Sequence, residues 1–206
     1  MIIPCDRRNY GGTRQKIRYI VIHYTAGKGD TARDNGLYFS RNAVGASAHW
    51  FVDDTDRVLS VPEDQVAWHC GGSYVHPDCR NSNSIAVELC SRWDGTYYFS
   101  PETVKNAVGL VRELMKTYDI PVDRVLRHYD VTGKKCPAPF VEAGPWNDFL
   151  EALMRYETLE QVPHWAQETV GKLMETQVLQ GDGQSLDLSH DMVRMLVMLD
   201  RAGVFG

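Results

Sequence analysis

Two apolar, β-branched runs that each end in a histidine constrain this fold more than any other feature of the sequence. Residues 17–23 are rich in Ile, Val and Tyr and stop at His23, and residues 124–128 stop at His128. Short runs of this composition are typical of buried strands. Each histidine is therefore expected where a rigid strand meets a loop, a common place for functional side chains.

The remaining pattern predicts strands and helices in alternation. Short strands are expected at 48–52 and 57–61, joined as a hairpin, and another at 84–90. Ser100 and Pro101 are typical of a helix start, and an apolar face continues to residue 118. Further helices are expected at 31–41 and 145–156. This mixture predicts an α/β or α+β domain with a mixed central β-sheet flanked by helices.

Residues after 156 form a separate pattern. We expect one domain over 1–156 and a small helical module over 157–206, with helices at 163–178 and after Ser189, joined by a turn at 181–183. Two helices of this length bury little surface alone. They are therefore expected to dock on the first domain or on a partner, and a homodimer formed through their apolar faces is one alternative.

Composition excludes some classes of function. The 206 residues carry a net charge of -5, with a pI near 5.8, which argues against a nucleic-acid partner. No run approaches the roughly 18 apolar residues of a membrane span, so no membrane partner is expected. Residues 1–8 lack the charged head and apolar run of a signal peptide. We therefore expect synthesis in the cytoplasm and release by lysis or another route.

The cysteines contain one candidate metal ligand. Five cysteines at irregular spacing do not form a disulfide framework, although a bridge between Cys70 and Cys79 stays an open alternative. Cys136 follows His128 closely enough for the intervening loop to bring both side chains to one ion. With His23, this gives three protein ligands, and three ligands with an open fourth position are typical of catalytic zinc.

Five blocks of the sequence resemble, in order, those of the zinc-dependent N-acetylmuramoyl-L-alanine amidases, the family of phage endolysins and bacterial autolysins related to the peptidoglycan recognition proteins. The blocks are residues 21–26, 47–53, 66–71, 83–88 and 128–137. The resemblance covers roughly residues 15–156. It implies an enzyme of the cell wall that uses Zn²⁺, takes bacterial peptidoglycan as substrate, and cleaves the amide bond between N-acetylmuramic acid and L-alanine.

The resemblance also implies roles for individual residues. His23, His128 and Cys136 match the zinc ligands of the family. Glu88 matches the catalytic acid/base of Bacillus-type members, and Lys134 matches a lysine that faces the substrate. Another branch carries a catalytic tyrosine where this chain has Ala48, so the mechanism is expected to depend on Glu88.

Substrate contacts are expected from Tyr24, Trp68 and His69, which lie in the same blocks. For His69, a role in holding a loop is an equal alternative, and core packing is the commoner fate of a tryptophan such as Trp68. His49 is expected to pack within the hairpin.

The chemistry suits these assignments. Zinc acidifies water to a pKa of about 7 and polarises a carbonyl. Glu88 could then move a proton from water to the leaving nitrogen, and Lys134 could stabilise the oxyanion.

Three other interpretations fit the sequence less well. A non-catalytic recognition module would typically lack the cysteine ligand that this chain has at 136. A zinc peptidase acting between amino acids would be favoured by a His-Glu-x-x-His helix, which the sequence lacks. A structural protein with an incidental metal site is disfavoured by the five blocks.

The C-terminal module has a resemblance of its own. Residues 162–166, 181–183 and 196–202 resemble one S-layer homology module, which implies binding to cell-wall polymers. Packing against the first domain and dimer formation are the alternatives.

Overall fold

The computed structural model describes residues 1–181 and 185–205. The chain divides into two compact units, Met1–Leu153 and Met154–Gly206, so the division falls a few residues before the boundary expected at 156. Among the described residues, no helix is long and apolar enough to cross a membrane.

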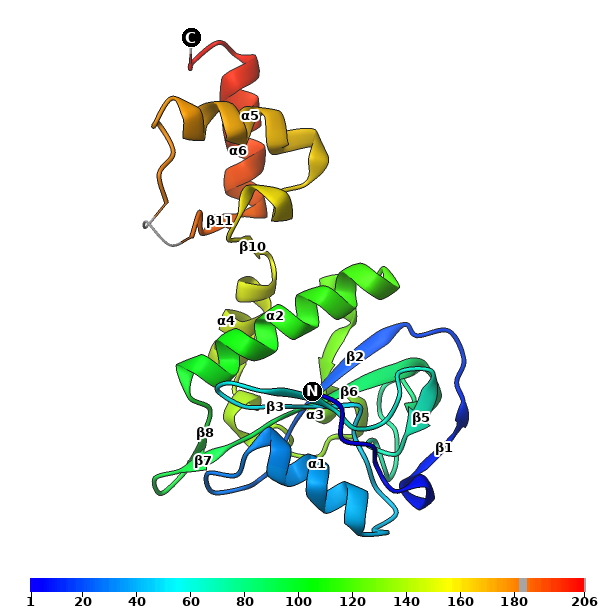
Figure 1. Cartoon of the computed structure of the whole chain (residues 1–206). Helices are drawn as coiled ribbons and strands as arrows, with labels where there is room; N and C mark the ends of the chain where they lie inside the picture. The colour runs from blue at the N-terminus through cyan, green and yellow to red at the C-terminus, as the bar shows by residue number, and fades with distance from the viewer. Residues whose placement is uncertain (182–184, 206) are drawn as a thin grey trace. The chain divides into compact units, whose positions relative to one another are not determined.

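A mixed β-sheet forms the centre of the first unit (Figure 1). Its strand order is β4-β3-β6-β2-β9, with bounds Arg57–Leu59, Trp50–Val52, Ser84–Leu89, Tyr19–Tyr24 and Val125–Arg127. Strand β2 runs parallel to both β6 and β9, and β3 runs parallel to β6 but antiparallel to β4. The predicted mixed α/β architecture is therefore confirmed.

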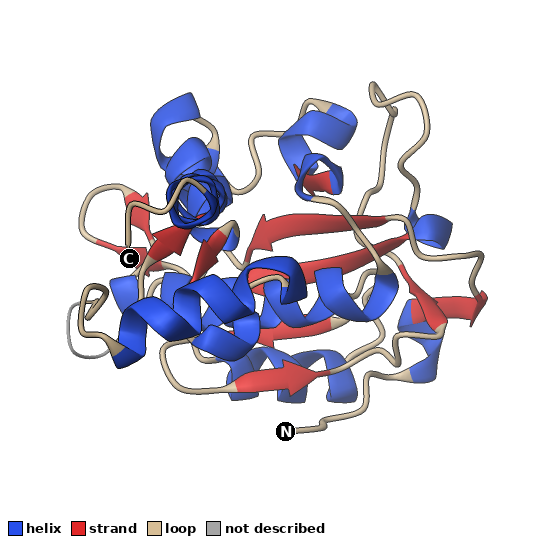
Figure 2. Cartoon of the chain, turned by 90° about the horizontal axis from the view of Figure 1, so that it is seen from above, coloured by secondary structure: helices blue, strands red, loops and turns tan. Residues whose placement is uncertain are grey.

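The two faces of the sheet pack against different elements, as the alternating side chains of β6 show. Ile85, Val87 and Leu89 belong to the main apolar core, which they share with helices α2 (Pro101–Tyr118) and α4 (Ala143–Leu153). Successive side chains of a strand point to opposite faces. Ser84 and Glu88 therefore face the other side, where α1 (Ala32–Arg41) and α3 (His128–Thr132) lie. Figures 1 and 2 show helices on both sides of the sheet.

Several predicted boundaries were wrong. Helix α4 ends at Leu153, not at 156, because Arg155 and Tyr156 are extended and pair with residues 188–189. The Arg112 guanidinium donates hydrogen bonds to the carbonyls of Ala152 and Leu153 in the last turn. Four short strands that pair as β1–β5 and β7–β8 were not predicted. Their bounds are Tyr10–Thr13 with Gln65–Ala67 and Arg92–Trp93 with Tyr97–Tyr98.

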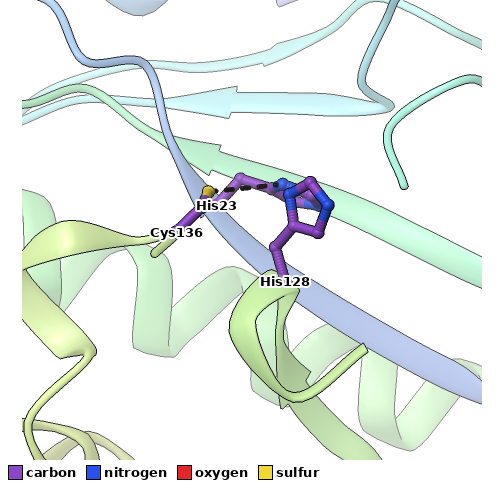
Figure 3. Close-up of side chains that lie close together, drawn as sticks. All are labelled: His23, His128 and Cys136. Carbon is purple, nitrogen blue, oxygen red and sulfur yellow. Dashed lines mark hydrogen bonds between the residues drawn. The ribbon is translucent and has the colours of Figure 1, made fainter. Parts of the chain in front are cut away.

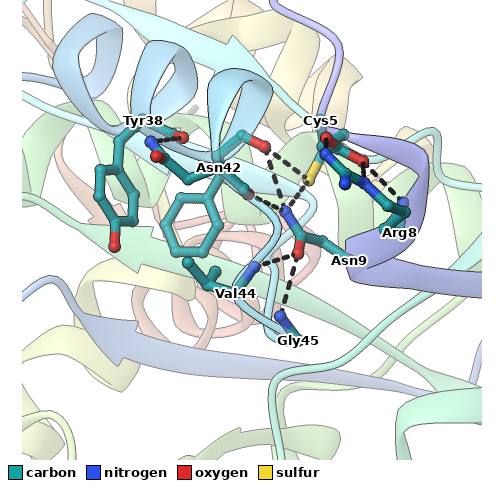
Figure 4. Close-up of polar contacts among 9 residues, drawn as sticks. Cys5, Arg8, Asn9, Tyr38, Asn42, Val44 and Gly45 are labelled. Carbon is teal, nitrogen blue, oxygen red and sulfur yellow. Dashed lines mark hydrogen bonds and ion pairs between the residues drawn. The ribbon is translucent and has the colours of Figure 1, made fainter.

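A buried amide fastens the N-terminal segment to the end of α1 (Figure 4). Asn9 is fully buried. Its Nδ2 donates to the carbonyls of Phe39 and Asn42 at 3.2 and 2.7 Å, and its Oδ1 accepts from the backbone N–H groups of Val44 and Gly45 at 2.7 and 3.0 Å. Every hydrogen-bonding atom of this side chain therefore has a partner.

The second unit contains helices α5 (His164–Glu175) and α6 (His190–Arg201). They share a small apolar core made by Val162, Ala166, Val170, Leu186, Leu188, Val193 and Val197. As predicted, Ser189 precedes the second helix, and its Oγ accepts from the N–H of Met192 at 3.1 Å. Strand β10 (Arg155–Tyr156) pairs with β11 (Leu188–Ser189). The turn expected at 181–183 lies partly outside the described residues.

Candidate metal centre

Strand pairing brings a histidine and a glutamate together near the carboxyl ends of two neighbouring inner strands. His23 on β2 and Glu88 on β6 occupy the same register position of two parallel strands. Their side chains therefore point to the same face, and His23 Nδ1 lies 4.0 Å from Glu88 Oε1. His23 is buried, and the Glu88 side chain is 20% exposed. A carboxylate at this position is neither in the core nor freely solvated.

The sequence predicted that His128 ends a strand, but in the structure it follows the strand directly. Strand β9 ends at Arg127, and His128 is the first residue of α3. The Asp130 carboxylate accepts from the Arg127 N–H at 2.8 Å, which turns the chain into the helix at this point. His128 is nevertheless buried, and its ring lies 4.7 Å from that of His23, centroid to centroid.

Cys136 completes the cluster because the chain turns back after α3. Gly133 ends α3 with a φ of 79°, and the Tyr129 N–H donates to the Cys136 carbonyl at 2.8 Å. The thiol is thereby brought to 3.7 Å from His23 Nδ1 (Figure 3). One ligand atom from each of His23, His128 and Cys136 lies within 4.8 Å of the others. The three residues singled out in the sequence therefore meet.

Unpartnered polar atoms show that this cluster fits a cation. Both ring nitrogens of His128 and the Glu88 Oε2 are buried without a hydrogen-bond partner among residues 1–181 and 185–205, which is rare and costly in a protein interior. Two ligands on a tetrahedral zinc, one nitrogen and one sulfur, lie about 3.5 Å apart, close to the 3.7 Å measured here. These three side chains could therefore hold a metal ion.

Burial governs the protonation of the cluster. Desolvation, with a further contribution from Lys134, lowers the pKa of His128 to about 4, and the pKa of His23 is also lowered well below its usual value, mainly by desolvation. Both rings therefore stay neutral near pH 7, as metal ligands must be. Desolvation raises the pKa of the Cys136 thiol to about 12. That thiol needs a nearby cation to become a thiolate ligand.

The pKa of Glu88 is strongly raised. Desolvation raises its pKa to about 8, with Lys134 acting in the opposite direction and Asp30 in the same direction. Lys134 is exposed, yet its ammonium acts on Glu88, His23 and His128 alike. It therefore lies near the cluster, on the loop between α3 and Cys136.

The three expected substrate contacts lie in different surroundings. Tyr24 follows His23, and its pKa is raised by burial and by Cys136, so it borders the site. Its ring packs edge-on against Tyr97 of β8 at 5.3 Å. A Cβ on Gly11 of β1 would lie 3.4 Å from the Trp68 indole nitrogen, so this ring lies against β1.

His69 contacts the ring nitrogen of His23 that does not face Cys136. Its Nδ1 is 3.1 Å from His23 Nε2, and its Nε2 is 3.1 Å from the Ser84 hydroxyl. Sequence reasoning missed Ser84, although its place on the Glu88 face of β6 follows from the two-residue period. It also treated Cys70 only as a candidate disulfide partner. Cys70 and Cys79 are free thiols, and Cys70 Sγ lies 3.2 Å from His69 Nδ1.

His49 is a structural histidine, but its ring contacts other segments and not the hairpin in which it was expected to pack. It is fully buried, its Nδ1 accepts from the Ala86 N–H at 2.9 Å, and its Nε2 contacts the Gln65 carbonyl at 3.2 Å and the Arg14 guanidinium. Both ring nitrogens are thus occupied within the protein, unlike those of His128.

Comparisons with known proteins agree with this geometry. The family model for N-acetylmuramoyl-L-alanine amidase (Amidase_2) matches residues 13–139. The N-acetylmuramoyl-L-alanine amidase CwlL of Bacillus licheniformis is 40% identical over 136 residues, which are 61% of this chain and 37% of that protein. The amidase BlyA of Bacillus subtilis (strain 168) is 34% identical over 155 residues, 68% of this chain and 41% of that protein.

A solved structure also matches a large share of the chain. The structure of PlyL superposes with a TM-score of 0.63 at 30% identity, covering 74% of this chain and 94% of that one. The chain spans about two-fifths of the length of the two curated relatives. Since the family model covers more than half of its residues, this chain belongs to the N-acetylmuramoyl-L-alanine amidase family.

Proposed function

We propose that this chain hydrolyses the amide bond between N-acetylmuramic acid and L-alanine in bacterial peptidoglycan, with Zn²⁺ as cofactor. The family membership supports the reaction. The observation that carries the proposal is the meeting of His23 Nδ1, Cys136 Sγ and the unpartnered His128 ring beside Glu88. Buried polar atoms without partners are explained when a cation satisfies them.

In this proposal His23, His128 and Cys136 hold the zinc, and the fourth position is left for water or substrate. When bound, the metal supplies Lewis-acid polarisation of the carbonyl and makes water more acidic. The protein contributes rigid placement, because His23 is held by the sheet and Cys136 by a backbone hydrogen bond to Tyr129.

Glu88 is the proposed general base and acid. Its carboxyl group lies beside His23, and Oε2 has no partner that would compete for a proton. A pKa of about 8, raised by desolvation, lies near the operating pH, where one group both accepts and donates protons efficiently. Glu88 would take the proton of the attacking water and deliver it to the leaving nitrogen.

Lys134 is the proposed electrostatic partner of the developing oxyanion. Its positive charge acts on Glu88 and on both histidines from an exposed loop, so it can meet substrate without being buried itself. Such stabilisation grows as charge develops in the transition state. Tyr24 would contact the substrate at the rim that it forms with Tyr97.

We propose the bacterial cell wall as the place of action. Residues 157–206 would then serve either in wall binding or in pairing of two chains. Sedimentation of the full chain with and without purified wall separates these two roles.

Digestion of purified peptidoglycan, with and without a chelator, tests the proposed reaction when the products are read by mass spectrometry. Free stems that begin with L-alanine, lost on chelation and restored by zinc, would support it. Intact wall with bound protein would indicate a recognition module instead. Cuts between amino acids of the stem would indicate a peptidase.

A further inference from the structure

A series of hydrogen bonds leads into the protein from His23 Nε2, the ring nitrogen that does not face Cys136. His23 Nδ1 faces Cys136 and Glu88, and its other nitrogen, Nε2, lies 3.1 Å from His69 Nδ1. His69 Nε2 lies 3.1 Å from Ser84 Oγ, and Ser84 Oγ lies 2.7 Å from the Arg80 carbonyl. All three distances fall within the hydrogen-bond range.

The last member of this series fixes the direction of every bond. A carbonyl oxygen can only accept, so the Ser84 hydroxyl donates its proton to Arg80. The Ser84 oxygen then accepts from His69 Nε2–H, which leaves His69 Nδ1 without a proton. A neutral imidazole has one donor and one acceptor nitrogen. His69 Nδ1 is therefore the acceptor, and His23 Nε2 must donate to it.

The result is one defined tautomer of His23. With its proton on Nε2, the lone pair of His23 is on Nδ1, the nitrogen 3.7 Å from Cys136 Sγ. Cys70 is compatible with this polarity, because its thiol at 3.2 Å can only add a second donor to His69 Nδ1. Metal-binding histidines generally depend on such a partner for their tautomer and orientation.

We propose that His69 is a positioning residue, which acts with Ser84 to hold His23 in the tautomer that presents Nδ1 to the metal. This inference rests on the proposed zinc site and deepens it. It assigns His69 to the support of His23, because both of its ring nitrogens are already engaged. A substrate contact through a ring nitrogen would break the series of bonds.

Zinc affinity of the full chain, measured by competition with a chromogenic chelator, is the first test. His69→Ala should weaken zinc binding by about 10–100-fold, the usual effect of losing such a partner. His69→Asn should recover much of the loss, because its Oδ1 can accept from His23 Nε2–H. His164→Ala, at an exposed histidine of the second unit, is the matched control and should bind zinc as the wild type does.

Ser84 supplies a test that a general loss of stability would not pass. Ser84→Ala should weaken zinc binding less than His69→Ala, because it frees His69 to adopt either tautomer without removing its ring. If Ser84 acts only through His69, the double variant should be no weaker than His69→Ala alone. Additive losses would mean that the two residues act independently, and would overturn the proposal.

The tautomer itself can be read by NMR of the ring nitrogens of ¹⁵N-labelled histidine. His23 should carry its proton on Nε2 in the wild type and populate both tautomers in His69→Ala. Unchanged tautomer and unchanged affinity in that variant would overturn the inference. His23, His69 and Cys70 also lie close enough together to hold an ion, so a second zinc ion that is lost in Cys70→Ala would overturn it too. A wild type that binds no zinc would instead refute the proposed function.

Discussion

Two buried polar clusters of the first unit, one around Asn9 and one around His128, differ in whether their atoms have partners. Asn9 forms four hydrogen bonds to backbone groups and uses its full capacity. His128 is nearly as buried, yet neither ring nitrogen has a partner in the part of the chain that the structure describes. The first arrangement stabilises a fold, and the second leaves binding capacity for something outside the chain. The two clusters are similarly buried, and they differ in whether the hydrogen-bonding capacity is met among the described residues.

The largest effect is expected from Cys136→Ser, which removes the proposed sulfur ligand from the cluster around His128. A hydroxyl is a poor substitute for a thiolate on zinc, so zinc affinity should fall by more than the roughly 100-fold that loss of a supporting partner costs. Turnover should fall with it. Zinc content measured after dialysis checks this, and full zinc occupancy in the variant would remove Cys136 from the ligand set.

Glu88→Gln should separate catalysis from metal binding within the same cluster. The amide keeps the shape of the side chain but cannot accept a proton, so turnover on purified peptidoglycan should fall by about 10²–10⁴-fold. Zinc affinity should change little, because Glu88 is not among the three grouped ligands. A variant with wild-type turnover would exclude Glu88 as general base.

Asn9→Ala should lower the stability of the fold and leave the metal site unaffected. It leaves the N–H groups of Val44 and Gly45 and the carbonyls of Phe39 and Asn42 without this partner, so unfolding should become easier by about 2–4 kcal/mol. Urea denaturation measures the loss. Zinc affinity of the folded variant should match the wild type, and a large change there would mean that the two clusters are coupled. Asn42→Ala, at an exposed asparagine nearby, should cost a fraction of this energy.

The smallest effect concerns pH. Desolvation, and then Arg14, holds the pKa of His49 well below its usual 6.5. The folded state therefore keeps His49 neutral while the unfolded chain takes up a proton below pH 6.5, so stability is full above that pH and declines as pH falls. One such proton contributes a slope of about 1.4 kcal/mol per pH unit.

Comparison with His49→Gln isolates this contribution, because the other buried histidines are common to both proteins. Stability curves between pH 7 and 5 should be shallower in the variant by up to about 1.4 kcal/mol per pH unit. His164→Gln, at an exposed histidine, should leave the slope unaltered. Parallel curves for His49→Gln and the wild type would show that His49 titrates normally.

The sequence allowed some parts of this site to be predicted and hid others. The strand that ends near His23 and the strand that carries Glu88 were predicted from β-branched composition, a local signal. The start of α3 at His128 was missed, because it depends on Asp130 capping the Arg127 backbone rather than on any apolar period.

Contacts between distant segments could not be predicted in this way. The bonds from His23 through His69 to Ser84 join three separate segments, and the Asn9 cluster joins the N-terminus to the end of α1. No periodicity in a single sequence encodes such pairs. The five-block resemblance named His69 but gave no indication of what its ring touches.

The shared register of His23 and Glu88 has a consequence for protein engineering. Their separation is kept by backbone hydrogen bonds between neighbouring parallel strands, whose spacing of about 4.8 Å is common to all sheets. The β7–β8 hairpin takes no part in this pairing, so changes to its length or sequence should leave the distance between His23 and Glu88 intact. Redesign of the protein should therefore vary surface segments of this kind and leave the two strands untouched.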